Sequence, residues 1–481
     1  MAFDDLRDYL AVLEQRGLLR RVREPVDPEW EIGCLVKWAF QSLPEEERFG
    51  LFFESVSGSR IPAVTGAFGA STEAYATALG VAPEEINAKW ERALRNPVPP
   101  VRTADAPCQE VVHEGGAVDL GLLPIPVWTP GKDAGRYITT IVATGDAETG
   151  VQNHGVYRTL VTGRDRLVCN LSPGRQGRLC CESHHALGRP APIAFVIGAE
   201  PAVYLAAVTN FPLGVDEAAL AGGLKEAPVE TVRARTVDLD VPARAEIVIE
   251  GLVYPGETAK EGPFGEFAGY MGPVSDRPVV RVTAITHRRD PVYYGIASQM
   301  PPSESTLMQS LTNAGALRKV LRHDLGERGV EDVHIDLTFG GLLAHAIVAM
   351  RPRGPGDAQR IGRIVAGIAP VKRVTVVDHN VDIRDPLHLD WAMNAHFDPA
   401  RDTVLIDNVF VPMYMDPSVR VRGGNTDPGS KIVVDATRSI DAGELSLPAR
   451  PLMEKALDSW RKAGLPEFEI PKRLAYRLDD A

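Results

Sequence analysis

Hydrophobic positions at the start of the chain follow the spacing of an amphipathic helix. Apolar residues recur there at intervals of three and four, at Phe3, Leu6, Tyr9, Leu10 and Leu13. Gly17 follows them, and glycine commonly ends a helix. The same reasoning predicts further helices at about 29–41, 71–79 and 83–95. With short strands between residues 50 and 68, we expect residues 1–105 to form an α/β region.

The pattern changes after residue 105, where short β-rich runs recur between Gly, Pro and Asp turns. The runs are RYITTIVATG, GVYRTLVTG, APIAFVIG, AVYLAAV, AEIVIEGLVY, PVVRVTAITHR and PVYYGIAS. Only residues 216–225 give a good helical pattern in this stretch. Many short strands with turns favour a barrel or a sandwich over a doubly wound sheet. We assign residues 106–300 to this β-rich domain.

Strands and helices alternate again after Met300. Ser303 is placed to cap a helix that runs through Leu311 to Val320. Strands are expected at VHIDLTFG, HAIVAMRPR and VKRVTVVD, and helices at 356–369 and 386–395. This alternation predicts a separate α/β domain at about 301–450. The tail, 451–481, has a helix at 451–463 that could contact a neighbouring subunit.

Composition and charge exclude several classes of protein. The 481 residues are 44% hydrophobic and carry a formal net charge of −12. An acidic protein does not suit nucleic acid, whose phosphates demand a basic face. A phosphate-bearing cofactor stays possible, since it needs only a local group of N–H donors and one or two cations. No GxGxxG or GxxxxGK[ST] sequence follows a predicted strand, which argues against dinucleotide and P-loop sites.

The sequence also predicts a reduced, cytoplasmic protein without a membrane span. The N-terminus MAFDDLRDYL has no basic segment before an apolar run, so we expect no signal peptide. The most apolar stretch, 191–208, is interrupted by Glu200 and Pro201 and is too short to cross a bilayer. The five cysteines are odd in number and lack CxxC spacing, which favours free thiols over disulfides or zinc.

The strongest chemical signal is the string EGPFGE, residues 261–266. Pro263 suits the second position of a tight turn and Gly265 the fourth, so the flanking residues should return toward each other. Glu261 and Glu266 would then face one another, and their repulsion would raise the pKa of one carboxyl and provide a proton donor. The residues alone favour the alternative, a solvated acidic turn, because such turns are common.

A second signal is NHGVYR, residues 153–158, at the start of a strand. An arginine within VYRTLV is unusual unless it reaches solvent or meets an anion. Asn153 and Arg158 would point to opposite faces of a regular strand. They could share a face if a bulge occurs near Gly155. The alternative is an edge strand with an exposed arginine.

A third signal is the loop NFPLGVDE, residues 210–217, which leads into a helix. Acids at a helix start usually serve the helix dipole, and this is the simpler interpretation of Asp216 and Glu217. A cation site would need further oxygen ligands, and Asn153 could supply one.

Taken together, these segments resemble the UbiD family of decarboxylases, which use prenylated FMN to remove or add CO2 on unsaturated, commonly aromatic, acids. EGPFGE is the most specific part, and the similarity runs along nearly the whole chain through APCQE, IGAEP, EIVIEG and VVDHNVD. The resemblance implies an N-terminal α/β region, a central FMN-binding split β-barrel, and a C-terminal α/β domain joined by a linker helix.

The resemblance also implies catalytic roles for Arg158, Glu261 and Glu266. The modified flavin would act as an electron sink while CO2 leaves. Glu266 would then protonate the vacated carbon. Arg158 would hold the substrate carboxylate or the electron-rich edge of the flavin. Glu261 would keep Arg158 in place and tune the pKa of its neighbour.

In the family, a divalent metal, usually Mn²⁺, and K⁺ bridge the flavin phosphate to an Asn, a His and a Glu. The Asn and Glu correspond to Asn153 and Glu217, but by spacing the His falls at Gln176, a weaker ligand without an imidazole. His184 and His185, adjacent on the chain, are interpreted as structural. The full set expected to bind the cofactor is Asn153, Val156, Tyr157, Arg158, Arg175, Gln176, Asn210, Phe211, Glu217, Lys372 and Arg373.

The substrate is expected to be an aromatic acid held among apolar side chains. The expected pocket residues are Met308, Trp391, Met393, Phe397 and Met413. Such a lining suits a flat ring, and methionine adapts to several shapes. Hydroxybenzoates and N-heteroaromatic acids both stay open. Implied partners are a flavin prenyltransferase as cofactor supplier and further copies of the chain, in a homodimer or homohexamer. The alternatives are a non-catalytic UbiD-like subunit and a plain FMN oxidoreductase.

Overall fold

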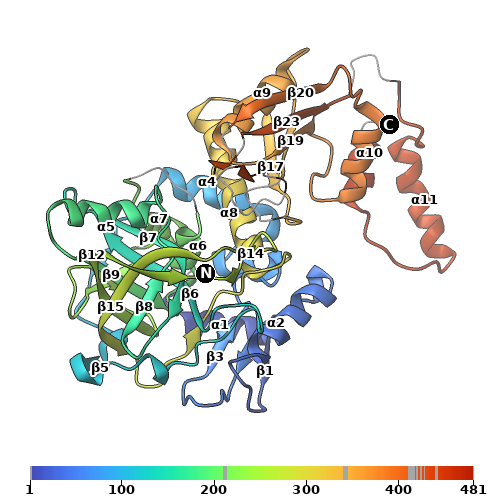
Figure 1. Cartoon of the computed structure of the whole chain (residues 1–481). Coiled ribbons are helices and arrows are strands. Elements are labelled where there is room, and N and C mark those ends of the chain that lie inside the picture. The colour runs from blue at the N-terminus through green and yellow to red at the C-terminus, as the bar shows by residue number, and fades with distance from the viewer. Residues whose placement is uncertain are drawn as a thin grey trace. The chain divides into compact units, whose positions relative to one another are not determined.

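The computed structural model describes residues 3–209, 214–339, 345–409, 418, 421–422, 425–426, 428–438 and 443–479. The chain forms two compact units. The first comprises Met1–Ala316 with Leu337–Gly341, and the second comprises Leu317–Asp336 with Leu342–Ala481. Figure 1 labels many of the elements of each unit.

The first unit begins with a small α/β region. Its four-stranded sheet has the order β1-β2-β3-β16, with bounds Leu19–Val22, Gly50–Phe53, Ala63–Thr65 and Tyr293–Tyr294. Its helices are α1 (Leu6–Gln15), α2 (Glu31–Ser42), α3 (Thr72–Leu79) and α4 (Ile86–Arg95). The four predicted helices are confirmed, and the last of them starts with a short 3-10 turn at Pro83–Glu85. Strand β16 comes from far along the chain, after the barrel.

The first unit also contains a closed antiparallel barrel (Figure 1). Within the described residues, six strands close it in the order β12-β9-β6-β7-β8-β15, and β15 pairs back with β12. Their bounds are β6 Tyr137–Gly145, β7 Gln152–Val161, β8 Arg166–Cys169, β9 Ala191–Ile197, β12 Ile247–Glu261 and β15 Ser275–His287. Strand β5 (Val111–Glu114) extends the sheet beyond β15. The expected central barrel is confirmed.

Two helices of the barrel region were not expected from the sequence. AVYLAAV, predicted as β-rich, lies mostly in helix α6 (Pro201–Ala207), and every residue of α6 is buried. An apolar run that is buried all round has no amphipathic period, so its pattern cannot separate helix from strand. Proline at the first helical position favours the helix. Helix α5 (Gln176–Ala186) was missed as well, whereas α7 (Glu217–Lys225) matches the predicted helix.

The second unit contains the predicted C-terminal α/β fold. Helix α8 (Glu304–Lys319) begins in the first unit, and its last residues belong to the second. The Ser303 hydroxyl accepts a hydrogen bond from the Thr306 N–H at 3.4 Å, as expected of a cap. The sheet order is β17-β18-β19-β23-β20, with bounds Val330–Ile335, His345–Met350, Arg373–Asp378, Gly429–Ala436 and Thr403–Val409. The remaining helices are α9 (Asp357–Ile368), α10 (Pro386–His396), α11 (Arg450–Lys462) and α12 (Lys472–Asp479).

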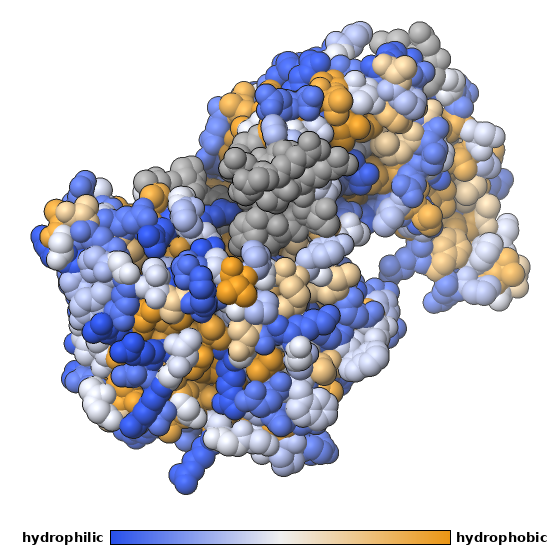
Figure 2. All heavy atoms as spheres, viewed as in Figure 1, coloured by the Kyte–Doolittle hydropathy of each residue, from blue (hydrophilic) through white to orange (hydrophobic). Residues whose placement is uncertain are grey.

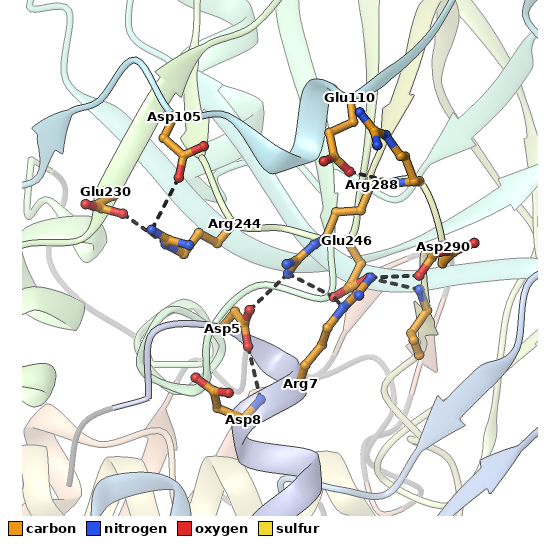
Figure 3. Close-up of polar contacts among 12 residues, drawn as sticks. Asp5, Arg7, Asp8, Asp105, Glu110, Glu230, Arg244, Glu246, Arg288 and Asp290 are labelled. Carbon is orange, nitrogen blue, oxygen red and sulfur yellow. Dashed lines mark hydrogen bonds and ion pairs between the residues drawn. The ribbon is translucent and has the colours of Figure 1, made fainter.

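A buried carboxylate fastens the N-terminal helix to the barrel (Figure 3). Glu246, whose side chain is 0% exposed, accepts two hydrogen bonds from Arg7 of α1, at 2.7 and 2.8 Å. Arg288 donates to Glu246 at 3.3 Å and to Asp5 at 3.0 Å. The α/β region and the barrel are therefore joined by charged contacts as well as by a common hydrophobic core.

A second buried carboxylate connects the α/β region with the start of α8. Glu304 accepts hydrogen bonds from the N–H groups of Gly66, Phe68 and Ala297 at 2.9, 3.0 and 2.8 Å, and from the Tyr294 hydroxyl. Burial raises the pKa of Glu304. These hydrogen bonds satisfy the buried carboxyl group, which therefore fixes the chain segment that leads from the barrel to α8.

Apolar side chains are exposed on helix α11 and the segment after it in the second unit (Figure 2). They include Leu452, Trp460, Leu465, Phe468 and Ile470.

In the described part of the chain, none of the helices has the length and apolar character needed to cross a membrane.

Candidate active site

The EGPFGE string forms a short hairpin at the end of strand β12. Glu261 is the last residue of that strand, and Phe264–Gly265 (β13) pairs antiparallel with Met271–Gly272 (β14). The Glu266 N–H donates to the Tyr270 carbonyl at 2.8 Å. The chain therefore returns after Glu266, between β13 and β14, and not within residues 262–265 as the turn prediction had placed it.

Both glutamates of the hairpin contact Arg158. The Nε and Nη2 atoms of Arg158 each lie 2.9 Å from an oxygen of Glu261, which is a two-point contact. Its Nη1 atom forms an ion pair with Glu266. All three side chains are at most 8% exposed. The two carboxylates thus do not oppose each other directly, as the turn geometry alone suggested, because a guanidinium lies between them.

Aromatic side chains cover this charged group. The Arg158 guanidinium lies 5.1 Å from the centre of the Phe264 ring, which in turn packs against Tyr137 at 4.5 Å. Burial and the nearby Glu261 raise the pKa of the Tyr137 hydroxyl. A Cβ atom at Gly272 would lie 2.8 Å from Glu266 Oε1, so only glycine leaves room for the ion pair.

Two residues that sequence reasoning missed hold the hairpin in place. The Tyr137 hydroxyl accepts a hydrogen bond from the Gly262 N–H at 3.1 Å. Asp133 accepts from the N–H groups of Gly265 at 2.9 Å and Thr129 at 2.7 Å. Asp133 stands in the turn-rich stretch TPGKDAGRY, which resembles any surface loop when read alone.

Strand β7 passes through Gly155 without the predicted bulge. Its pairing with β6 is regular from Gly145–Gln152 to Tyr137–Leu160, so Asn153 and Arg158 lie on opposite faces, and the expectation of a bulge is wrong. A Cβ atom at Gly155 would lie 2.7 Å from the Tyr157 ring. This glycine makes room for a side chain of its own strand rather than for an extra residue.

A second polar cluster lies on the Asn153 face of β7. The Tyr157 hydroxyl accepts from the N–H of Gly177, in the first turn of α5, at 3.1 Å. Burial raises the pKa of Tyr157 to about 12, although hydrogen bonds from Gly177 and Asn153 act in the opposite direction. The structure thereby brings Asn153, Tyr157 and the Gln176 end of α5 together.

Glu217, the first residue of α7, joins this cluster through the strand backbone. Its Oε2 atom accepts from the His154 N–H at 3.0 Å, and the side chain is buried. Burial raises the pKa of Glu217 to about 7, and the neighbouring charge that acts on it is another acid, Asp216. A buried carboxyl without a cationic partner is costly unless a cation binds, so the donor set fits one.

Across the described residues, no three His, Cys, Asp or Glu side chains group closely enough to hold a metal by themselves. A cation here would therefore need amide oxygens and phosphate beside Glu217. The N-terminus of α5 fits a phosphate, since its cap residue, Arg175, makes no side-chain capping bond.

Comparisons with known proteins agree with this geometry. Three family models match the chain in succession: the UbiD N-terminal domain over residues 10–94, the 3-octaprenyl-4-hydroxybenzoate carboxy-lyase Rift-related domain over 100–301, and the UbiD C-terminal domain over 306–436. The chain belongs to the UbiD family. It is accordingly an enzyme of the carboxy-lyase class.

Solved UbiD structures match almost the full chain. The UbiD-class enzyme HmfF from Pelotomaculum thermopropionicum, in complex with FMN, is 36% identical with a TM-score of 0.83, covering 94% of this chain and 99% of that one. An evolved dimeric form of HmfF with prFMN is 36% identical with a TM-score of 0.81, covering 95% and 100%. Vanillic acid decarboxylase from Sedimentibacter hydroxybenzoicus is 29% identical with a TM-score of 0.84, covering 96% and 100%.

Several other residues expected from the UbiD resemblance lie in the second unit. Lys372 donates to Ser418 at 2.7 Å, and Arg373 contacts His345 Nδ1 at 2.8 Å. Trp391, Met393 and Phe397 pack against the core of this unit, and Arg477 lies over the Trp391 ring. Their contacts with cofactor or substrate remain predictions.

The remaining expected residues fall in three groups. Met308 is fully buried on α8, and Val156 is partly buried on β7. His184 and His185 contact backbone carbonyls of Gly145 and Val253 at 3.1 and 3.0 Å, as structural histidines would. Asn210, Phe211 and Met413 lie outside the described residues.

Proposed function

We propose that this UbiD-family enzyme catalyses the reversible decarboxylation of an aromatic or heteroaromatic carboxylic acid with prenylated FMN. The observation that carries the proposal is the buried Arg158, which contacts Glu261 and Glu266 at once. A family relative bound to prFMN and another that acts on vanillic acid support the cofactor and the substrate class.

Arg158 and the two glutamates that contact it can serve separate roles in substrate binding and proton transfer. When bound, prenylated FMN supplies an electron sink for the pair left by CO2. Glu261 fixes the guanidinium plane through two hydrogen bonds. Arg158 can then orient a carboxylate, and Glu266 can carry the proton that replaces CO2 on the oxygen turned away from Arg158. Phe264 and Tyr137 keep water from the charged group.

The cluster of Asn153, Gln176 and Glu217 would hold the phosphate end of the cofactor through Mn²⁺ and K⁺. Arg158 follows Asn153 by five positions, which corresponds to about 17 Å of extended strand. An elongated cofactor with phosphate at one end and its reactive ring at the other would link two sites at that spacing by passing from one face of β7 to the other. Arg175, which precedes α5, would add positive charge near the phosphate.

The proposal extends to partners and location. A flavin prenyltransferase would supply the cofactor. The exposed apolar side chains of α11 and the segment after it suit contact with another copy of the chain, in a homodimer or homohexamer. The five cysteines are free thiols, which suits the reducing cytoplasm.

The deciding experiment replaces the proton donor. Protein co-expressed with a flavin prenyltransferase should release CO2 from one or more aromatic acids. Glu266→Gln keeps the shape of the side chain but removes the acid, so turnover should fall by about 100-fold or more while flavin content is unchanged. Glu257→Gln, on the same strand, is the control and should retain turnover.

Two results would contradict the proposal. Near-normal turnover by Glu266→Gln would place the proton donor elsewhere. If the flavin-loaded parent releases no CO2 from any aromatic acid, a non-catalytic subunit becomes the better interpretation.

A further inference from the structure

Gln299 is a buried amide without hydrogen-bond partners. Its residue is 3% exposed, and neither its side-chain oxygen nor its nitrogen has a partner among the described residues. A buried polar group that is left unsatisfied in this way destabilises the fold. Such a group calls for an explanation, and a ligand that binds to it is one.

The Gln299 side chain lies against the catalytic hairpin. A Cβ atom at Gly265 would come within 2.9 Å of Gln299 Cγ, and the next residue after Gly265 is Glu266. A second contact joins the same segment to the arginine. The Ile296 N–H donates to the Thr139 carbonyl at 3.0 Å, and Thr139 is the register partner of Arg158 across β6 and β7.

Helix α2 holds this segment in an uncommon conformation. Gln299 has a φ of +70°, in the left-handed region that is unfavourable for a residue other than glycine. Lys37 donates to the Ser298 carbonyl at 2.6 Å, and Gln41 donates to the carbonyls of Met300 and Pro302 at 3.0 and 2.9 Å. Backbone of this kind persists where its surroundings fix it, and it is concentrated at ligand sites.

We infer that Gln299 determines substrate specificity by hydrogen bonding to a polar atom on the substrate ring. This inference rests on the proposed function and narrows its substrate class to acids that carry a polar atom on the ring. The amide offers one acceptor and two donors, so it suits a ring N–H, a ring heteroatom or a ring hydroxyl. An unsubstituted ring would leave the amide unsatisfied, and sites built around a hydrogen bond discriminate strongly against ligands that lack it.

The test compares acids with and without such an atom. Pyrrole-2-carboxylate, furan-2-carboxylate and 4-hydroxybenzoate are compared with benzoate. Two quantities are measured: kcat/KM for CO2 release by the prenylated-FMN enzyme, and Kd by calorimetry on protein loaded with unmodified FMN. The parent should prefer at least one polar-ring acid over benzoate by about 100-fold. Gln299→Leu should reduce that preference at least tenfold in both measurements.

Two further variants make the result specific. Gln299→Glu keeps the acceptor and loses the donors, so it should weaken binding of the ring N–H acid less than binding of the furan. Gln109→Leu removes an amide that bonds to the Arg233 carbonyl elsewhere in the unit, and it should leave the preference unchanged.

The inference and the proposed function fail in different ways. A working enzyme whose preference is the same in the parent and in Gln299→Leu overturns the inference alone. Loss of flavin from Gln299→Leu, with the preference intact in the loaded fraction, would show that the amide serves the cofactor and would also overturn it. If no acid is turned over by the parent, the proposed function fails, and the binding measurements still decide the inference.

Discussion

Arg158 uses every nitrogen of its guanidinium within one buried group. Nε and Nη2 bind Glu261, which leaves Nη1 for Glu266. A planar fork can satisfy two carboxylates in fixed directions, whereas an ammonium is a point charge on a flexible chain. The geometry therefore depends on arginine as such, and not only on a positive charge.

Substitutions of Arg158 test whether the site needs the planar geometry of a guanidinium or only its positive charge. Arg158→Lys should lower turnover by about 100-fold or more, and Arg158→Ala should abolish it, because lysine cannot hold both glutamates in place. Turnover is measured at equal flavin content. Arg166→Lys on the neighbouring strand β8, where the side chain is 55% exposed, is the control. Full activity of Arg158→Lys would show that charge alone suffices.

The sequence indicated these three residues, and the family resemblance implied that Glu261 holds Arg158, but turn geometry did not predict an arginine between the two carboxylates. The EGPFGE motif and the arginine in NHGVYR pointed to them, yet turn geometry placed the two carboxylates face to face. The arginine between them is 103 positions away from Glu261 along the chain. Local rules describe which residues a turn brings together, and they do not show what a distant strand inserts there.

At the scale of elements, the pattern of apolar residues identified most strands and helices. It failed for α6, whose residues are all buried, and for α5, whose sequence QGRLCCESHHA has no clear apolar stripe. Periodicity reports the contrast between a buried and an exposed face. Periodicity therefore does not detect an element with little contrast, and α5 is one that contributes to the proposed cation cluster.

The elements α5, α7 and β7 together make the proposed cation cluster, so removing its carboxyl tests the whole arrangement. Glu217→Ala should prevent flavin loading, and chelator treatment of the parent should release flavin. Gln176→His should bind the metal as well as the parent or better, because imidazole is the stronger ligand for manganese-like ions. Flavin absorbance and metal content of purified protein provide the measurement.

The control for this test is Glu182→Ala, which removes a 46% exposed acid of α5 and should not change loading. Normal loading of Glu217→Ala would mean that cationic side chains such as Arg175 or Arg373 hold the phosphate without a metal.

At the scale of the whole molecule, the three predicted regions do not correspond one to one with compact units. The α/β region and the barrel lie within the first unit. Glu246 bonds across the boundary between them, and Glu304, at the start of α8, bonds to the backbone of the α/β region. The change from helical to β-rich patterns near residue 105 was visible in the sequence. Contacts between buried acids and distant groups do not affect the periodicity of apolar residues, so the sequence pattern does not predict them.

Glu246 should therefore stabilise the first unit as a whole. Glu246→Gln keeps the size of the side chain but leaves Arg7 without its charged partner and Arg288 with Asp5 alone, which should lower the free energy of unfolding by about 2 kcal/mol. Glu230→Gln, which alters the more exposed contact with Arg244, should cost less than about 1 kcal/mol. Urea unfolding measures both, and equal losses would show that Glu246 has no special role.

The buried group around Arg158 also has a consequence for electroneutrality. One guanidinium accompanies two carboxyl groups, so the site already carries an excess of negative charge when both are ionised. A carboxylate substrate would add another, and uncompensated charge in a buried site is costly. Substrate is therefore expected to enter together with a proton. The overall reaction consumes one proton for each CO2 released. A proton that enters with the substrate carboxylate would therefore match the proton that each turnover consumes.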